Sequence, residues 1–300
     1  MHTGLVYALL AFGSWGLFPL YFALIATVPP LEVVLHRSVW SLLFVLAVLA
    51  WQGRWAWLGE TLRQPARVAL FAFSALLLAC NWLVYVLAVQ TGHVAEASLG
   101  YFINPLVSVL LGVLVLRERL RPLQWAAVAV AAGGVLWLTW QGGRLPWIAL
   151  ALAGTFGVYG LMRKTAPLGA LEGLALENLL LAPLAVPALL WWSFMNDGVL
   201  STGPASQIGL LLVSGPLTAL SLLWFAGAAR RLKLATLGLV QYLSPTLQLL
   251  LAVWVFHEPF DPARLLGFVM IWSALALVSA DALGWRPGVR RPTDGPLPRS

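Results

Sequence analysis

The chain has 300 residues, of which 61% are hydrophobic and only 10% are charged, and its mean hydropathy is +0.87. A soluble domain carries about a quarter charged residues, so this composition excludes a water-soluble globule and favours a protein that lipid solvates. The net charge of +7 does not indicate a nucleic-acid partner, because the basic residues lie in short loops and in the tail, as membrane topology requires.

The N-terminal stretch MHTGLVYALLAFGSWG has no basic region before its apolar run and continues as a full-length span. We therefore interpret it as a first transmembrane helix and not as a cleaved signal peptide. Cys80 is the only cysteine, which excludes an internal disulfide and a thiolate metal site.

Ten apolar segments approach the roughly 20 residues that a helix needs to cross the hydrocarbon core. They are 4–26, 33–51, 68–90, 95–116, 122–140, 145–162, 173–195, 207–229, 234–256 and 263–283. The stretch 52–67 is too polar to span, so we expect it at the membrane interface. The basic, proline-rich tail 284–300 is expected to be disordered.

The basic residues predict the orientation of the chain. The loops after the second, fourth, sixth and eighth segments, together with the tail, hold fifteen of the 18 lysines and arginines. Basic loops stay on the cytoplasmic side, so both termini are expected to be cytoplasmic.

The sequence repeats itself at an offset of about 140 residues. The offset aligns Asn104-Pro105 with Ser244-Pro245 and Glu32 with Glu172, and an offset of 141 aligns Gly13-Ser14-Trp15-Gly16 with Gly154-Thr155-Phe156-Gly157. We therefore predict an all-α integral membrane protein of ten transmembrane helices, built from two five-helix repeats at 1–141 and 142–283. Because five is odd, the second repeat is inverted relative to the first, as in one large class of secondary transporters.

The two aligned prolines are expected to break their helices near the midplane. Pro105 lies ten residues into the fourth segment and Pro245 eleven residues into the ninth. At 1.5 Å per residue these depths are about 15 and 16 Å, from opposite faces of a core about 30 Å thick.

Several motifs resemble a known family. The two helix ends VLVLRERLRP (113–122) and VWVFHEPFDP (253–262) resemble EamA domains of the drug/metabolite transporter superfamily. Four further stretches are similar to the RarD group of bacterial inner-membrane permeases: EVVLHRSVWS, NWLVYVLAV, EASLGYFINPLVSVLLG and RLKLATLGLVQYLSPTLQLLLAV. The resemblance, from about residue 4 to 283, implies a chloramphenicol-related permease of the inner membrane. It also implies a central cavity lined by the first to fourth and sixth to ninth helices, with the fifth and tenth packed together.

The opening of the second segment carries three ionisable residues. Glu32 and His36 share one helix face, and Arg37 lies one to two turns from the outer surface. A Glu32/Arg37 pair that only ends the helix is one interpretation. A cavity-facing Arg37 that receives an anionic or zwitterionic substrate is the other, and we favour it because ionisable groups inside membranes are usually functional. Chloramphenicol is neutral and has little need of this cation.

Polar and aromatic side chains at similar depth complete the expected substrate site. The candidates are His36 and Arg37 with Trp15, Asn81, Tyr101, Asn104, Gln241 and Tyr242. Asn81 alone is also explained by a simple interhelical hydrogen bond. Glu32, Glu96 and Glu177 are candidates for proton coupling or gating, although a carboxylate at a helix end is also favourable on its own. Glu177 occupies the place of Arg37 in the second repeat.

The sequence favours a secondary transporter over two alternatives, a membrane enzyme and a non-transporting scaffold. It contains neither an HExxH motif nor a Walker A lysine, so we expect no enzyme activity, no metal and no cofactor. The duplication and the polar groups within the spans argue against a scaffold. The expected partners are a small-molecule substrate and membrane lipids. The sequence leaves open whether the chain forms a homodimer.

Overall fold

The computed structural model describes residues 2–91, 94–142, 147–257 and 262–282, and in these ranges the chain is helical with no strand. The helices are α1 (His2–Ala23), α2 (Pro30–Gln52), α3 (Ala56–Leu62), α4 (Pro65–Gln90), α5 (Val94–Leu114), α6 (Pro122–Gly142), α7 (Trp147–Thr165), α8 (Ala170–Met195), α9 (Val199–Thr202), α10 (Ala205–Ala229), α11 (Leu234–Gln241), α12 (Leu243–Trp254) and α13 (Pro262–Ala282). The predicted tail, 284–300, lies outside the described residues.

Prolines and a glycine set several of these boundaries. Four of the helices begin with a proline, namely α2, α4, α6 and α13. Proline suits the first helical position because its missing N–H has no partner there and its fixed φ is already helical. The helix α2 ends at Gly53, whose φ of 63° is a left-handed conformation that a residue without Cβ adopts easily.

Seven helical stretches in the described part are long and apolar enough to cross a membrane: α1, α2, α8 and α10 in full, and Pro65–Tyr85, Pro122–Gln141 and Leu234–Leu251. The remaining predicted spans correspond to α5, α7 and α13, of which α5 and α13 contain the shorter apolar stretches Leu99–Leu114 and Leu265–Ala274. Large apolar side chains point away from the bundle, such as Leu184 (74% exposed) and Trp140 (84% exposed). Such a surface suits contact with lipid.

Two elements differ from the prediction. The helix α7 continues past residue 162 and includes Arg163 and Lys164, which the charge pattern had placed in a loop. The predicted span 234–256 consists of two helices, because α11 ends at Gln241 and α12 begins at Leu243. The polar stretch 52–67 contains the short helix α3 and no candidate span.

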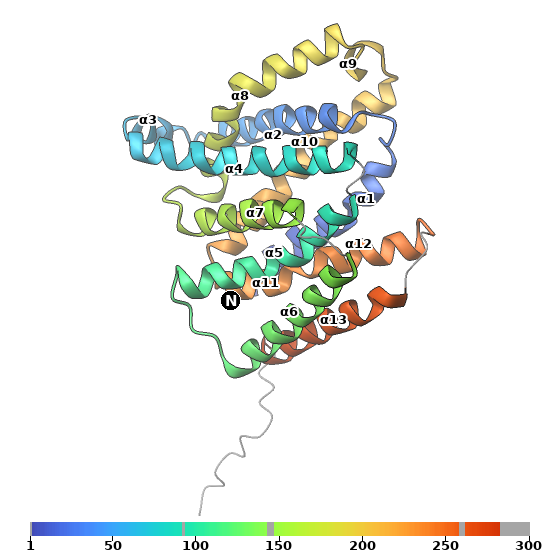
Figure 1. The fold of residues 1–300 in the computed structure, drawn as a ribbon. Helices are drawn as coiled ribbons and strands as arrows, with labels where there is room; N and C mark the ends of the chain where they lie inside the picture. The colour runs from blue at the N-terminus through green and yellow to red at the C-terminus, as the bar shows by residue number, and fades with distance from the viewer. Residues whose placement is uncertain (1, 92–93, 143–146, 258–261, 283–300) are drawn as a thin grey trace, which may run out of the picture.

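The helices lie side by side, with α8 at one edge of the bundle and the pair α6 and α13 at the other (Figure 1). The packing of α6 on α13 confirms the expected contact between the fifth and tenth spans. A Cβ atom on Gly134 would lie 2.7 Å from the Gly267 carbonyl oxygen, so only small residues allow this approach. Between these edges, α5 packs against α7 and α11, and α2 packs against α8 and α10. This arrangement surrounds a cavity.

Candidate functional site

The cavity has a volume of about 180 Å³ and is lined by α1, α2, α4, α5, α7, α10, α11 and α12. One water needs about 10–15 Å³ by the same measure, so a small organic molecule fits. The lining comes from the C-terminal parts of α1 and α4 and the N-terminal parts of α2 and α5, which places the cavity toward one end of the bundle. The helix α8, expected in the lining, contributes no described residue to it and packs against α2, α4 and α10 instead.

Arg37 is the only charged residue of the described lining. Its Nε donates a hydrogen bond to Thr218 Oγ1 at 3.0 Å. Its guanidinium carbon lies 5.4 to 5.7 Å from the ring centroids of Trp82, Phe22 and Phe18, within the range of cation–π attraction. Among the side chains that the structure describes, no carboxylate forms an ion pair with Arg37.

Glu32 and His36 lie outside the cavity lining and are almost fully buried. Glu32 Oε1 accepts a hydrogen bond from the backbone N–H of Val199, at the start of α9, at 2.6 Å. His36 Nδ1 accepts a hydrogen bond from Trp40 Nε1 at 2.8 Å, and its Nε2 lies 3.7 Å from Glu32 Oε1. Glu32 therefore connects α2 to the start of α9, and His36 contacts Glu32 and Trp40 on its own helix, on a different face of α2 from Arg37.

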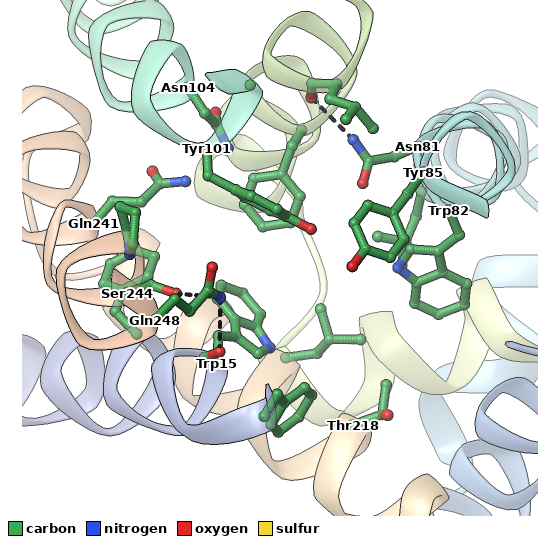
Figure 2. A pocket seen from close by; sticks show the side chains of 18 of the residues that line it. Trp15, Asn81, Trp82, Tyr85, Tyr101, Asn104, Thr218, Gln241, Ser244 and Gln248 are labelled. Atoms are coloured by element: carbon green, nitrogen blue, oxygen red, sulfur yellow. Dashed lines mark hydrogen bonds between the residues drawn. The ribbon is translucent and has the colours of Figure 1, made fainter. Parts of the chain in front are cut away.

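A cluster of uncharged polar side chains forms another wall of the cavity. Asn104, Gln241, Ser244 and Gln248 lie together on one side, with Thr218 across the cavity from them (Figure 2). Gln248 Nε2 donates to the Trp15 carbonyl at 3.1 Å. Asn104 is 4% exposed, and its Oδ1 has no hydrogen-bond partner among the described residues. This wall therefore contains a buried amide oxygen that no described group satisfies.

The facing wall carries Asn81, Trp82 and Tyr85 (Figure 2). Asn81 Nδ2 donates to the Leu152 carbonyl and to Thr155 Oγ1, both at 2.9 Å, which confirms the predicted interhelical hydrogen bond. The ring centroids of Tyr85 and Tyr101 are 6.2 Å apart, and both hydroxyls project into the cavity (Figure 2).

Tyr242 and the two prolines lie differently from the prediction. Tyr242 is fully buried against the cluster that contains Phe102 and Ile271, and it does not line the cavity. One residue along a helix turns the side chain by about 100°, so Gln241 and Tyr242 cannot share a face. The helix break expected at Pro105 is absent, because α5 continues through it. Near Pro245, which lines the cavity, the junction of α11 and α12 falls at Tyr242.

Glu177 lies away from the cavity, in a buried ion pair. It is 1% exposed, as is Arg163, and Arg163 Nη1 is 3.4 Å from Glu177 Oε1. The Ser74 hydroxyl donates to Glu177 Oε1 at 2.5 Å, and the Tyr159 hydroxyl to Oε2 at 3.4 Å. Glu177 therefore joins α4, α7 and α8. The third candidate acid, Glu96, belongs to the first turn of α5, and its side chain lies outside the described part.

An aromatic layer separates the cavity from this ion pair. Trp15 and Phe156 line the cavity, with ring centroids 5.5 Å apart. Behind them, Phe225 lies 5.2 Å from Phe156 and stacks on Tyr159 at 6.0 Å. Since Tyr159 also bonds to Glu177, the layer and the ion pair form one continuous closure of the cavity.

Sequence reasoning missed several residues of this region. Trp82, Tyr85, Thr218 and Gln248 line the cavity, and Arg163 completes the buried pair. A polar residue one helical turn from a candidate was the available signal for Tyr85, which follows Asn81 by four positions. No group of three or more metal-ligating side chains occurs within the described ranges.

Comparison with known proteins agrees with the motifs. Residues 2–140 match the EamA-like transporter family. The chain is 48% identical over 98% of its length to an uncharacterized transporter of Pseudomonas aeruginosa, of which it covers 98%. It is 45% identical over 94% of its length to Protein RarD of Streptomyces exfoliatus, of which it covers 89%. One crystal structure, 21% identical, has the same fold, with a TM-score of 0.69 over 94% of this chain and 98% of that one.

Proposed function

The chain belongs to the EamA family and to its RarD group, and from this premise we propose that it is a secondary transporter of a small organic metabolite or drug that works by alternating access. It is a multi-pass membrane protein whose relatives are named as transporters. The observation that carries the proposal is a cavity with one cation, closed on one side by the aromatic layer and the buried Arg163–Glu177 pair.

The proposal includes ten spans in two inverted repeats, 1–141 and 142–283. The described helices fit ten spans if α11 and α12 form one and the short α3 and α9 form none. Equivalent contacts support the inversion. Glu32, at the start of α2, binds the chain that follows α8, and its counterpart Glu172, at the start of α8, binds Arg54 in the chain that follows α2.

Two glycines support the same relation. A Cβ atom on Gly16 would lie 2.7 Å from Leu247, and a Cβ atom on Gly157 would lie 2.6 Å from Val107. Leu247 and Val107 are 140 residues apart, and the glycines are 141 apart. The contact between α1 and α12 is thus equivalent to the contact between α7 and α5.

We place the protein in the bacterial inner membrane with both termini in the cytoplasm. The distribution of basic residues supports this orientation. The cavity then lies in the outer half of the membrane, and the Arg163–Glu177 pair in the cytoplasmic half. Transport requires that the pair and the aromatic layer separate while the walls around Arg37 close. Glu177 is the candidate acid best placed to couple protons to this change, because it joins three helices that must move apart.

Alternating access can be tested without knowing the substrate. In a Cys80→Ser background, Ser244→Cys places a thiol on the cavity wall near the midplane. A membrane-impermeant maleimide is expected to label this cysteine in right-side-out and in inside-out vesicles, because the site opens to each side in turn. Leu184→Cys, on an exposed apolar face of α8, is the control and should react from neither side. Labelling of Ser244→Cys from one side only would favour the non-transporting scaffold.

A further inference from the structure

We propose that the cavity binds an organic monoanion with three parts: a carboxylate held by Arg37, an aromatic or apolar body against the ring side chains, and a hydrogen-bond donor that reaches Asn104. This inference deepens the proposed function and rests on it, because it names the class of molecule that the same cavity carries. Each part follows from a different wall of the cavity.

The charge of the cavity selects the charge of the ligand. Arg37 contributes one positive charge, and no acidic side chain belongs to the described lining. A ligand with one negative charge neutralises this site, whereas a cation adds a second uncompensated charge among apolar groups. A zwitterion gains the contact with Arg37, but its ammonium group then lacks a carboxylate partner in the described lining. A neutral ligand leaves the positive charge of Arg37 without a counter-charge.

The geometry of Arg37 suits a carboxylate. Its Nε is occupied by Thr218 Oγ1, and the Thr218 hydroxyl itself donates to the Ser214 carbonyl at 2.7 Å, which fixes the oxygen that Arg37 contacts. The terminal Nη groups make no hydrogen bond within the described structure, so their donors stay available for a paired contact with two carboxylate oxygens. Thr218 is therefore a positioning residue for Arg37.

The middle and the far end of the cavity define the rest of the ligand. Trp15 and Phe156 line the cavity with rings whose centroids are 5.5 Å apart, and Trp82 presents a third ring from the facing wall. An aromatic body packs well on such rings. At the far wall, Asn104 Oδ1 is a buried acceptor without a partner in the described residues. A buried acceptor is most stable when a donor reaches it, so the Asn104 amide, which belongs to the cavity lining, is expected to turn its oxygen toward a hydroxyl or N–H group on the ligand.

A series of five compounds that share a phenylethyl group separates these features. They are 3-(4-hydroxyphenyl)propionate, its methyl ester, 3-phenylpropionate, tyramine and tyrosine, each measured by calorimetric titration of the purified full-length protein in detergent. The hydroxylated acid is expected to bind most tightly. The neutral ester and the cation tyramine should bind at least about tenfold more weakly, since a charged hydrogen bond contributes more than one factor of ten. Zwitterionic tyrosine and 3-phenylpropionate, which lacks the donor, should each lose a factor of about five to ten.

Variants then assign the effects to residues. Arg37→Ala should remove the preference for the acid over its ester, whereas Arg37→Lys, which keeps the charge, should retain part of it. Asn104→Leu should remove the preference for the hydroxylated over the plain acid and leave the acid-over-ester preference intact. Thr218→Val should weaken the acid and not the ester. Because the ligand series on the unmodified protein already tests the charge rule, a variant that fails to fold does not remove the test.

The inference is overturned if the ester or tyramine binds as tightly as the acid, or if no acid of the series binds at millimolar concentration. Its failure is separable from failure of the transport proposal. Labelling of Ser244→Cys from both faces without a preference for anions would reject only the ligand class. A preference for anions with labelling from one face would reject only alternating access.

Discussion

Arg37 and Glu177 are 140 residues apart, which is the offset of the sequence repeat, but their surroundings differ. Arg37 faces a cavity, with one hydroxyl bonded to it and three aromatic rings around it. Glu177 is sealed among Arg163, Ser74 and Tyr159, and both partners of its ion pair are 1% exposed. Under the proposed inverted repeat, the same place in the fold is open at Arg37 and closed at Glu177.

The difference separates a charge that holds helices together from a charge that lies on a cavity wall. A buried pair is costly to break, because each charge then lacks its partner. Arg37 has no carboxylate partner among the described side chains, so its removal leaves no described charge unpaired. Substitutions at Glu177 and at Arg37 should therefore have unequal effects on stability, and the predictions below run from the largest expected loss to the smallest.

Glu177→Ala should cause the largest loss of stability. It leaves Arg163 buried without its carboxylate, and removing one member of a buried pair costs about 3–5 kcal/mol. Thermal unfolding in detergent measures the loss. The double variant Arg163→Met with Glu177→Leu is the control and should recover most of it, because apolar residues of similar volume often replace a buried pair without cost. If the double variant does not recover stability, the hydrogen bonds of Ser74 or Tyr159 to the Glu177 carboxylate also stabilise the fold.

Gly157→Val and Gly16→Val should each destabilise the protein by about 1–3 kcal/mol, the usual cost of overpacking. The new Cβ atoms would lie 2.6 Å from Val107 and 2.7 Å from Leu247, so a helix must move in each case. Gly154→Ala is the matched control and should change little, because nothing lies within 4 Å of its new Cβ atom. Similar losses at the two glycines would support the inverted repeat, and a large loss at only one would count against equivalent contacts.

Glu118→Gln should cost about 1 kcal/mol, the usual value of a helix cap. The carboxylate of Glu118 accepts hydrogen bonds from the backbone N–H groups of Leu234 at 2.7 Å and Ala235 at 3.0 Å, at the start of α11. A neutral amide keeps only one acceptor and loses the favourable interaction with the helix N-terminus. Glu60→Gln is the control: its carboxylate is 69% exposed and pairs with Arg67 at the surface, so thermal unfolding should change little.

Much of the helical plan could be predicted from the sequence, because apolar runs bounded by prolines and basic loops leave few alternatives. The location of Arg37, Tyr101, Asn104 and Gln241 in the cavity lining agrees with the prediction, since polar groups within a span must face protein or a cavity. It was harder to predict which of two adjacent side chains faces the cavity. His36 precedes Arg37 and Tyr242 follows Gln241, and in each pair one side chain points away from the cavity.

Arg163 shows what a count of charges cannot reveal. It follows an apolar segment and precedes Lys164, a pattern that is typical of a cytoplasmic loop. In the structure it belongs to the last turn of α7 and is buried against Glu177 and the ring of Phe71. The partner lies fourteen positions along the chain on a different helix, so only the packing of α7 on α4 and of α4 on α8 brings these groups together.

Arg37→Gln should have the smallest effect on stability, less than about 1 kcal/mol in either direction. The change removes cation–π contacts, each of which contributes about 0.5–1 kcal/mol at an accessible site, but it also removes the cost of a charge within a span. No described carboxylate loses its partner, and the Thr218 hydroxyl keeps its bond to the Ser214 carbonyl. Thermal unfolding of this variant beside Glu177→Ala gives the direct comparison. A loss as large as that of Glu177→Ala would mean that Arg37 is a structural charge, and the two charged sites would then be alike in holding helices together.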